Sequence, residues 1–239
     1  MFDFVPPVMV LQGDAVELLR RLDSASVDLV ITDPPYESLE KHRKIGTTTR
    51  LKKSKASSNE WFPIFPNSRF RELFREVYRV LKPDSHFYLH CDAETMFFAK
   101  PLAEEVGFKF WKPLVWDKQR IGMGYHYRAR YEFILFFEKG KRKLQHLGIA
   151  DILQAPRIAN GYPTEKPKSL AATLIAQSSR PGELVCDPFM GSASVGAAAR
   201  DSDRYFLGFD VADEAMGLAR ARLKLAGTTV STLTSQPDI

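Results

Sequence analysis

The chain reads ELVCDPFMGSASVGAAARDSDRYFLGFD at residues 183–210. Its first residues, Glu183 to Cys186, form a short apolar run that predicts a buried strand. Residues Ala193 to Arg200 predict a helix, and residues Arg204 to Phe209 predict a second strand. A strand, a helix and another strand in direct succession are the repeating unit of a parallel sheet, so this stretch indicates an α/β fold.

The loop after the first of these strands has the composition of a nucleotide-binding turn. Gly191 lets a ligand approach the backbone, and the free N–H groups of the helix that follows can meet a carboxylate or a phosphate. Asp210 ends the next strand about 20 residues later, the usual separation for an acid that binds ribose hydroxyls. We therefore expect a cofactor that contains a nucleoside. Gly191 to Gly196 also reads as a degenerate G-x-G-x-x-G, so a dinucleotide oxidoreductase remains an alternative.

A second loop, Asp33-Pro34-Pro35-Tyr36, directly follows the apolar run Val27 to Thr32. The exocyclic amine of a nucleobase is a poor nucleophile because its lone pair is delocalised into the ring, and acceptors aimed at its N–H groups make the nitrogen more reactive. Asp33 supplies one acceptor, proline holds the chain at a fixed φ and can present the Pro34 carbonyl as another, and Tyr36 offers a face for stacking. The loop predicts a site for a flat, polar ring.

These two loops come together if the sheet is circularly permuted. Glu183 to Cys186 and Arg204 to Phe209 then serve as the first and second strands, Val8 to Leu11 as the third and Val27 to Thr32 as the fourth. In the order 3-2-1-4-5, the first and fourth strands are neighbours at the switch point where ligands bind. We therefore expect the two loops to face one crevice, in a single domain over residues 1–226 with a flexible tail at 227–239.

Two details of the middle of the chain are also predicted. Asn67 or Ser68 is expected to cap a helix over residues 69–81, and Lys82-Pro83 to end it. Residues 140–163 have an irregular pattern, and they are interpreted either as a small target-recognition insert or as a plain connection.

Composition is that of a globular protein with a polyanionic partner. The 239 residues are 44% hydrophobic and 26% charged, with a net charge of +5. Residues 37–65 form a basic loop beside Tyr36, and its first part, 37–55, holds seven Lys and Arg against two Glu. Together with a basic stretch before Tyr131, it supplies the residues predicted to contact a polyanion, which the resemblance given below implies to be DNA: Lys41, Arg43, Lys44, Arg50, Lys52, Lys53, Lys55, Arg128 and Arg130.

Other classes of site are disfavoured. Cys91 and Cys186 lie in strand-like contexts and are expected to be buried free thiols, which argues against a C5-cytosine methyltransferase with its nucleophilic cysteine. His90-Cys91-Asp92 lacks a second ligand pair, so no metal site is predicted. No run has the length of a membrane span, and the N-terminus lacks the order of a secretory signal.

These motifs together resemble the β class of amino-methyltransferases, the permuted S-adenosylmethionine-dependent DNA enzymes. The similarity runs from about Gly13 to Leu225 and includes Arg79-Val-Leu-Lys-Pro83, Tyr131-Glu-Phe-Ile-Leu135 and Thr164-Glu-Lys-Pro167. It implies a single-domain, Rossmann-like fold with a doubly wound, mostly parallel seven-stranded sheet whose last strand is antiparallel.

The resemblance also implies roles for individual residues. Asp33, Pro34, Pro35 and Tyr36 would hold a flipped base and form the catalytic loop. Residues implied to bind S-adenosyl-L-methionine are Asp14, Asp33, Thr164, Lys166, Pro167, Asp187, Pro188, Phe189, Gly191, Ser192, Ala193 and Asp210. Ala193 departs from the family, which usually has a second glycine there, and its methyl group is expected to tighten the pocket.

Asp at the first motif position is associated in this family with adenine, so the implied reaction is methylation of adenine N6 in double-stranded DNA. N4-cytosine or RNA methylation and a non-catalytic DNA-binding module remain alternatives. The resemblance further implies a homodimer, a cognate restriction endonuclease as partner, and a cytoplasmic, nucleoid-associated protein of bacterial or phage origin.

Overall fold

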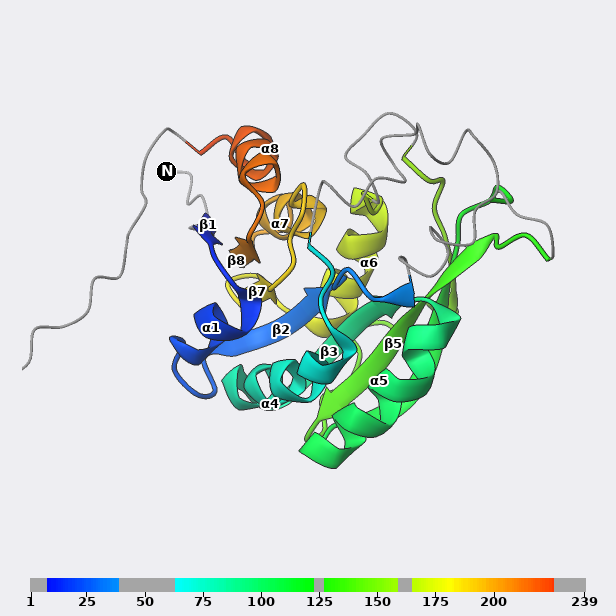
Figure 1. Cartoon of the computed structure of the whole chain (residues 1–239), viewed down its shortest axis with the longest axis horizontal. Coiled ribbons are helices and arrows are strands. Elements are labelled where there is room, and N and C mark those ends of the chain that lie inside the picture. The colour runs from blue at the N-terminus through cyan, green and yellow to red at the C-terminus, as the bar shows by residue number, and fades with distance from the viewer. Residues whose placement is uncertain (1–7, 39–62, 123–126, 159–164, 226–239) are drawn as a thin grey trace, which may run out of the picture.

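Eight strands form one sheet in the computed structural model, which describes residues 8–38, 63–122, 127–158 and 165–225. The order across the sheet is β1-β8-β7-β2-β3-β5-β4-β6 (Figure 1). The strands are β1 (Val8–Gln12), β2 (Val27–Thr32), β3 (Leu81–Cys91), β4 (Lys109–Asp117), β5 (Tyr131–Lys139), β6 (Ile152–Gln154), β7 (Leu184–Asp187) and β8 (Tyr205–Asp210).

This order confirms the permuted sheet. β7, β8, β1 and β2 occupy the places expected for the first, second, third and fourth strands, and β7 pairs in parallel with both β8 and β2. β5 is antiparallel to both of its neighbours and lies between β3 and β4 rather than at an edge.

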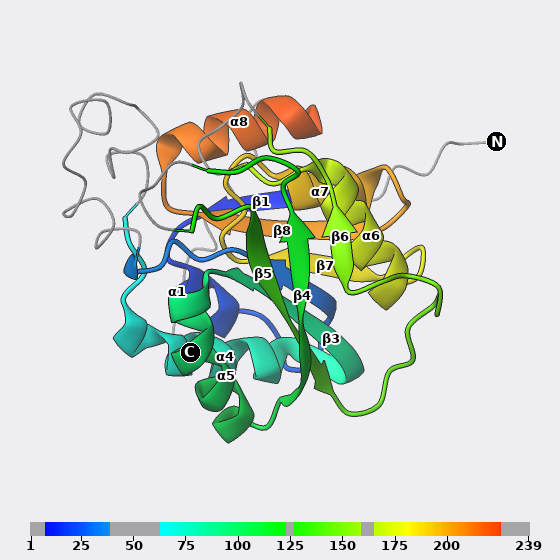
Figure 2. The ribbon, with the colours of Figure 1, turned by 90° about the vertical axis from the view of Figure 1, so that its right-hand side faces the viewer.

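The expected count of seven strands was one too few. β6 comes from the stretch 140–163 and pairs in parallel with β4 at the edge of the sheet, as Figure 2 shows. Its three residues are too few to give a readable alternation of apolar and polar side chains.

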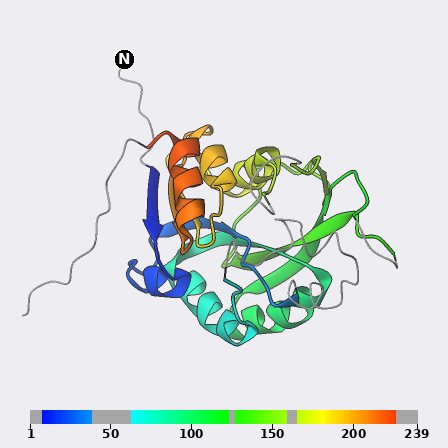
Figure 3. The same cartoon turned by 45° about the horizontal axis from the view of Figure 1, so that its top comes forward.

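Helices cover both faces of the sheet (Figures 1 and 3). On one face lie α6 (Lys168–Ser178), α7 (Ser194–Arg200) and α8 (Asp213–Leu223); on the other lie α1 (Ala15–Arg20), α4 (Phe70–Val80) and α5 (Ala93–Val106). All six residues of β2 are buried, because this strand is covered on both sides.

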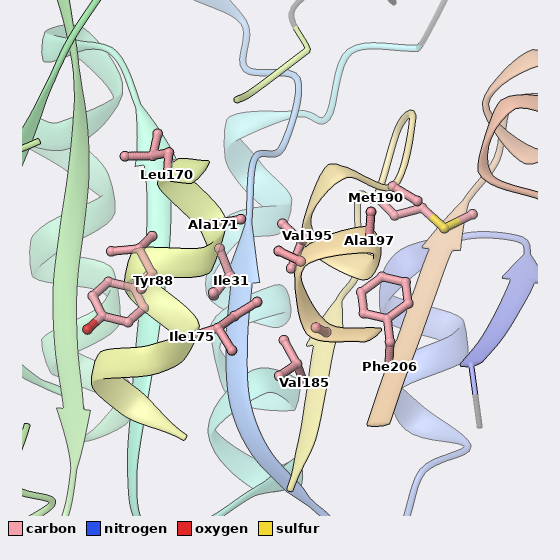
Figure 4. Packing of buried hydrophobic residues seen from close by; sticks show 14 of the residues in the cluster. Ile31, Tyr88, Leu170, Ala171, Ile175, Val185, Met190, Val195, Ala197 and Phe206 are labelled. Atoms are coloured by element: carbon pink, nitrogen blue, oxygen red, sulfur yellow. The ribbon is translucent and has the colours of Figure 1, made fainter. Parts of the chain in front are cut away.

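Two buried clusters correspond to the two faces. The cluster on the α6–α8 side includes Ile31, Tyr88, Ile175 and Phe206, whose side chains lie between the helices and the sheet in Figure 4. The cluster on the other side contains Val30, Phe74 and Cys186. Neighbouring residues of β5 alternate between the two clusters, with Ile134 in the first and Leu135 in the second, as the pleat requires. Both cysteines are buried and free, as predicted.

The start of α4 differs from the expectation. Neither Asn67 nor Ser68 caps it; both lie in a short 3-10 helix, Asn67–Arg69, that leads into α4 without a side-chain cap. The helix ends at Val80 because Leu81 is already extended and pairs with Val27, so the Lys82-Pro83 pair lies within β3.

Candidate active site

One cavity of about 420 Å³ lies beyond the carboxyl ends of β2, β7 and β8. Its lining includes the whole loop Asp33–Tyr36 and the loop Asp187–Ser192, together with Asp210. The loops meet because β2 and β7 are hydrogen-bonded neighbours, with Leu29 opposite Val185. Two stretches about 150 residues apart in the sequence therefore share one wall, at the topological switch point of the sheet.

Phe65 joins the two loops. Its N–H donates to the Pro35 carbonyl at 2.7 Å, and it forms an isolated bridge with Tyr36. Its ring packs edge-on against Phe189, with ring centroids 5.0 Å apart. Burial raises the pKa of the Tyr36 hydroxyl well above its ordinary value, so this ring is neutral at physiological pH. The result is an apolar, aromatic wall that spans both loops.

Asp187 lies at the floor of the cavity. Its Oδ1 accepts from the Thr32 hydroxyl at 2.9 Å and from the Phe189 N–H at 3.1 Å. Only 4% of the residue is exposed, and this burial raises the pKa of Asp187 to about 7 although both hydrogen bonds lower it. A cationic ligand group placed here would favour the ionised carboxylate.

Asp210 is fixed by backbone donors. Gly191 N–H donates to Oδ2 at 3.0 Å and Ala212 N–H donates to Oδ1 at 2.9 Å, while burial raises the pKa of the carboxyl group. Gly191 has a φ of 50°, a left-handed conformation that glycine adopts without steric cost. The turn thus holds an acceptor at the end of β8, facing the cavity.

Two residues implied to bind the cofactor do not line the cavity. Ala193 is fully buried, belongs to the core on the α6–α8 side and adopts a left-handed conformation with φ 57°. The Ala193 side chain thus packs in the core, and the effect of its methyl group on the pocket stays a prediction. Pro167 lies at the start of α6, where its carbonyl accepts from Leu170 N–H.

Asp14 lines the cavity, but its carboxylate is already engaged. It caps α1 through Val16 N–H at 3.0 Å and forms two hydrogen bonds with the Arg69 guanidinium, at 2.7 and 2.8 Å. The Arg69 hydrogen bond lowers the pKa of Asp14. This pair links α1 to the start of α4 along one side of the cavity.

Asp33 contacts a buried lysine. Lys166 Nζ binds Asp33 Oδ2 and lies 3.3 Å from Glu132 Oε2, while Lys118 Nζ lies 2.5 Å from Glu132 Oε1. Burial raises the pKa of Asp33, and the Lys166 charge opposes that shift. Burial also acts to raise the pKa of Glu132, but Lys166 and Lys118 together lower it to about 2.

Sequence reasoning missed Glu132, Lys118, His90 and Trp116, which all line the cavity. For Glu132 a signal was present. In the strand Tyr131–Lys139, alternation places Glu132 on the same face as the buried Ile134. A charged side chain on an apolar strand face could therefore have been identified from the sequence as a candidate site residue. His90 is buried, and burial lowers its pKa to about 3, so its imidazole is neutral.

The predicted DNA contacts are only partly within the described residues. Arg128 and Arg130 are exposed before β5; Arg130 pairs with Asp117 at 2.7 Å, and Arg128 Nε donates to the Gly122 carbonyl at 2.6 Å. The remaining predicted DNA contacts lie outside the described residues: Lys41, Arg43, Lys44, Arg50, Lys52, Lys53 and Lys55. Thr164, implied to bind the cofactor, also lies outside them.

Two negative findings hold for the described part of the chain. No group of three or more His, Cys, Asp or Glu side chains is arranged to hold a metal ion. None of its helices combines the length and the apolar character needed to span a membrane.

The chain is similar to known proteins in sequence and in fold. The chain is 28% identical to the type II methyltransferase M.HpaI of Haemophilus parainfluenzae, over 88% of this chain and 72% of that protein. It is 27% identical to the DNA adenine methyltransferase YhdJ of Escherichia coli K12, over 91% and 83%.

Among solved structures, the M1.HpyAVI–SAM complex superposes with a TM-score of 0.68 at 23% identity, covering 91% of this chain and all of that one. The cytosine-N4-specific PvuII DNA methyltransferase superposes with a TM-score of 0.70 at 18% identity, over 97% and 92%. Both likenesses concern the fold. The family described as DNA methylase, of the N6 and N4 type, matches residues 27–160 and 145–221, and the chain belongs to this family.

Proposed function

We propose that this protein transfers a methyl group from S-adenosyl-L-methionine to the N6 amine of an adenine flipped out of double-stranded DNA. The observation that carries the proposal is the single cavity shared by the Asp33–Tyr36 loop and the Asp187–Ser192 loop. A methyl donor and an acceptor base must lie side by side, and the neighbouring strands β2 and β7 put their loops side by side.

The residues present fit the cofactor. The volume of the cavity lies within the range of small-molecule sites, about 300–1,000 Å³. Asp210 offers an acceptor for ribose hydroxyls, and the buried Asp187 offers a partner for the methionine ammonium group. Phe189 and Gly191 shape the pocket between them. When bound, the cofactor supplies an electrophilic methyl group on a sulfonium.

The chain's own part in the reaction is to hold and polarise the base. Stacking on Tyr36 offsets the few kcal/mol that flipping costs. Asp33 accepts a hydrogen bond from the N6 amine and draws its lone pair out of the ring, while Pro34 and Pro35 keep the loop stiff. Positioning and electrostatics supply the acceleration, and no covalent enzyme intermediate is required.

Adenine is the proposed base. Support comes from Asp33 at the first motif position and from the relative named a DNA adenine methyltransferase. The fold does not separate the bases, since it is shared with a structure named cytosine-N4-specific. Methylation of cytosine N4 therefore remains the alternative reaction, which the labelling experiment below distinguishes from adenine methylation.

Two segments are proposed to bind DNA. The basic loop 37–65 adjoins Tyr36 and carries a local excess of five positive charges over 37–55. Residues 140–163, which contribute β6, are proposed as the target-recognition insert. Replacing the cations with glutamine should weaken DNA binding and flatten its dependence on salt; the residues to change are Lys52, Lys53 and Lys55. If the variant and wild type had the same affinity for DNA across a salt titration, the loop would not be a DNA-binding segment.

We further propose a homodimer, because so short an insert gives one subunit little surface with which to read a site. Sedimentation that detects only monomer, with and without DNA, would reject this. Relatives named type II methyltransferases support a cognate restriction endonuclease as partner. A DNA substrate implies a cytoplasmic, nucleoid-associated protein.

The decisive test is incubation with isotope-labelled S-adenosylmethionine and mixed genomic DNA or RNA, followed by mass analysis of the nucleosides. Labelled N6-methyladenine from DNA is expected. Label in N4-methylcytosine would move the reaction to the other base, and label in RNA to the other polymer. No label in any nucleoside from wild type would remove the proposed function.

A further inference from the structure

A chain of four charged groups ends at the carboxylate proposed to polarise the amine. It runs Lys118, Glu132, Lys166 and Asp33, and we call it the ion chain. Lys118 Nζ lies 2.5 Å from one Glu132 oxygen, the other Glu132 oxygen lies 3.3 Å from Lys166 Nζ, and Lys166 Nζ contacts Asp33 Oδ2. The signs alternate along the chain, so every carboxylate touches at least one ammonium group.

Strand register builds this arrangement. Trp116 of β4 lies opposite Glu132 of β5, and Thr32 of β2 lies opposite Leu89 of β3, so Asp33 continues the row beside His90. Period-2 alternation places Glu132 and Asp33 on the face that carries Ile134 and Ile31, in the α6-side core. Lys166 comes from the segment just before α6, which packs on this same face.

The ion chain is poorly hydrated already. The side chains of Asp33 and Lys166 are 24% and 11% exposed, and both line the cavity. Filling the cavity with cofactor and base would remove this remaining water. A lone carboxylate in such a place takes up a proton rather than stay charged.

A protonated Asp33 would be the wrong partner for the base. The N6 amine brings N–H donors, and an ionised carboxylate offers only acceptors, whereas a carboxylic acid places an O–H donor on one oxygen. Asp33 must therefore stay ionised in a site that burial makes hostile to charge.

The other titratable groups around Asp33 do not supply a compensating cation in direct contact. His90 on β3 and Tyr36 on the same loop are neutral, and Glu132 on β5 acts to raise the pKa of Asp33. Asp187 on β7 is a further acid, and Asp33 acts to raise the pKa of Asp187. Lys118 on β4 lies beyond Glu132. Among the described residues, the cation that touches Asp33 is Lys166, whose own pKa burial would lower but Asp33 and Glu132 raise.

We propose that Lys166 is a positioning residue that keeps Asp33 in its ionised, hydrogen-bond-accepting form, and that Glu132 accepts from Lys166 and so orients the ammonium group toward Asp33. This deepens the proposed function and rests on it for the role of Asp33. The charge state itself is a property of the protein without ligands, and it can be measured there.

The first measurement is a carbon-13 NMR titration of aspartate carboxyls in the ligand-free protein, with Asp33 assigned through Asp33→Asn. Lys166→Met should raise the pKa of Asp33 by about 1–3 units, the effect of an opposite charge at contact distance. Lys166→Arg should keep the wild-type value. Lys168→Met is the matched control, because Lys168 lies two residues after Lys166, is exposed and pairs with Asp201 instead.

A change at Glu132 should not raise the pKa of Asp33. Glu132→Gln removes a negative neighbour while its amide oxygen still accepts from Lys166, so the pKa of Asp33 should stay or fall. An Asp33 pKa that rises as far in Glu132→Gln as in Lys166→Met would indicate general disruption of the site. That result would overturn the assignment to the Lys166 charge.

Kinetics at saturating cofactor provide the second measurement. In Lys166→Met the acidic limb of the kcat profile should move upward by the same 1–3 units, so activity lost at neutral pH returns toward pH 9. A raised KM for the cofactor with an unchanged acidic limb and an unchanged Asp33 titration would make Lys166 a cofactor ligand only. If wild type transfers no methyl group, the proposed function fails, yet the NMR titration still decides the charge state.

Discussion

Asp187 should couple cofactor binding to the release of a proton. Burial raises its pKa from 3.8 to about 7, a shift of about three units, which at 1.36 kcal/mol each corresponds to about 4 kcal/mol against ionisation in the empty site. An ammonium group bound beside Asp187 would restore the charged form. At pH 6 the empty site is about nine-tenths protonated, so binding should release about 0.9 proton. Affinity should then rise about tenfold per pH unit up to pH 7 and level off above it.

Calorimetry in two buffers of different ionisation enthalpy measures the released proton directly. The control is Asp187→Asn, which cannot ionise and should bind more weakly without that pH dependence. If this variant released as many protons at pH 6 as wild type does, the coupling would lie elsewhere and the reasoning would be wrong.

The same shift predicts how stability depends on pH. A carboxyl whose folded pKa is raised binds its proton more tightly in the folded state, so its contribution is lost as pH rises from about 4 to about 7. Wild type without cofactor should lose up to about 4 kcal/mol of unfolding free energy through this group across that window. Asp187→Asn should show a flatter curve in urea titrations, and an equally steep curve would contradict the assignment.

Three further changes test the site and the fold. Asp33→Ala should retain cofactor binding by calorimetry, but methyl transfer should fall by about 10²-fold or more because the carboxylate that accepts from the amine is gone. Turnover at the wild-type rate would show that Asp33 does not have this role. Tyr36→Ala should weaken capture of a flipped base by about 1–3 kcal/mol in a 2-aminopurine fluorescence assay, whereas Tyr36→Phe, which keeps the ring, should not. Gly196→Ala would put a Cβ 2.6 Å from the Phe206 ring and should cost about 1–3 kcal/mol in urea unfolding, while Gly217→Ala, with open space around it, should be neutral or stabilise by up to about 1 kcal/mol.

Local pattern was enough to predict the permuted order of the sheet. The strands at residues 27–32 and 184–187 lead into the pairs Asp33-Pro34 and Asp187-Pro188, and each pair opens a loop at the carboxyl end of its strand. Given the order of the remaining strands and helices, topology alone makes those ends neighbours. The sharing of one cavity by the loops of Tyr36 and Phe189 followed from connectivity rather than from side-chain detail.

Elements and contacts that depend on residues distant in the sequence could not be predicted from the sequence. β6 exists because the edge of β4 is available to pair with it, and α4 ends at Val80 because Leu81 pairs with Val27. A short segment has no periodicity of its own that could reveal either event, since the stabilising hydrogen bonds come from another part of the chain.

The sequence by itself determined that the loops of Asp33 and Asp187 follow buried strands, because residue type and strand position are local properties. Tertiary structure alone decided that Lys166 would touch Asp33, that Glu132 would hold Lys166, and that the Ala193 methyl group would face the core. The physical reason is that burial and long-range electrostatics depend on which surfaces meet after folding. Two charged side chains interact strongly only when the fold brings them together and excludes water from between them.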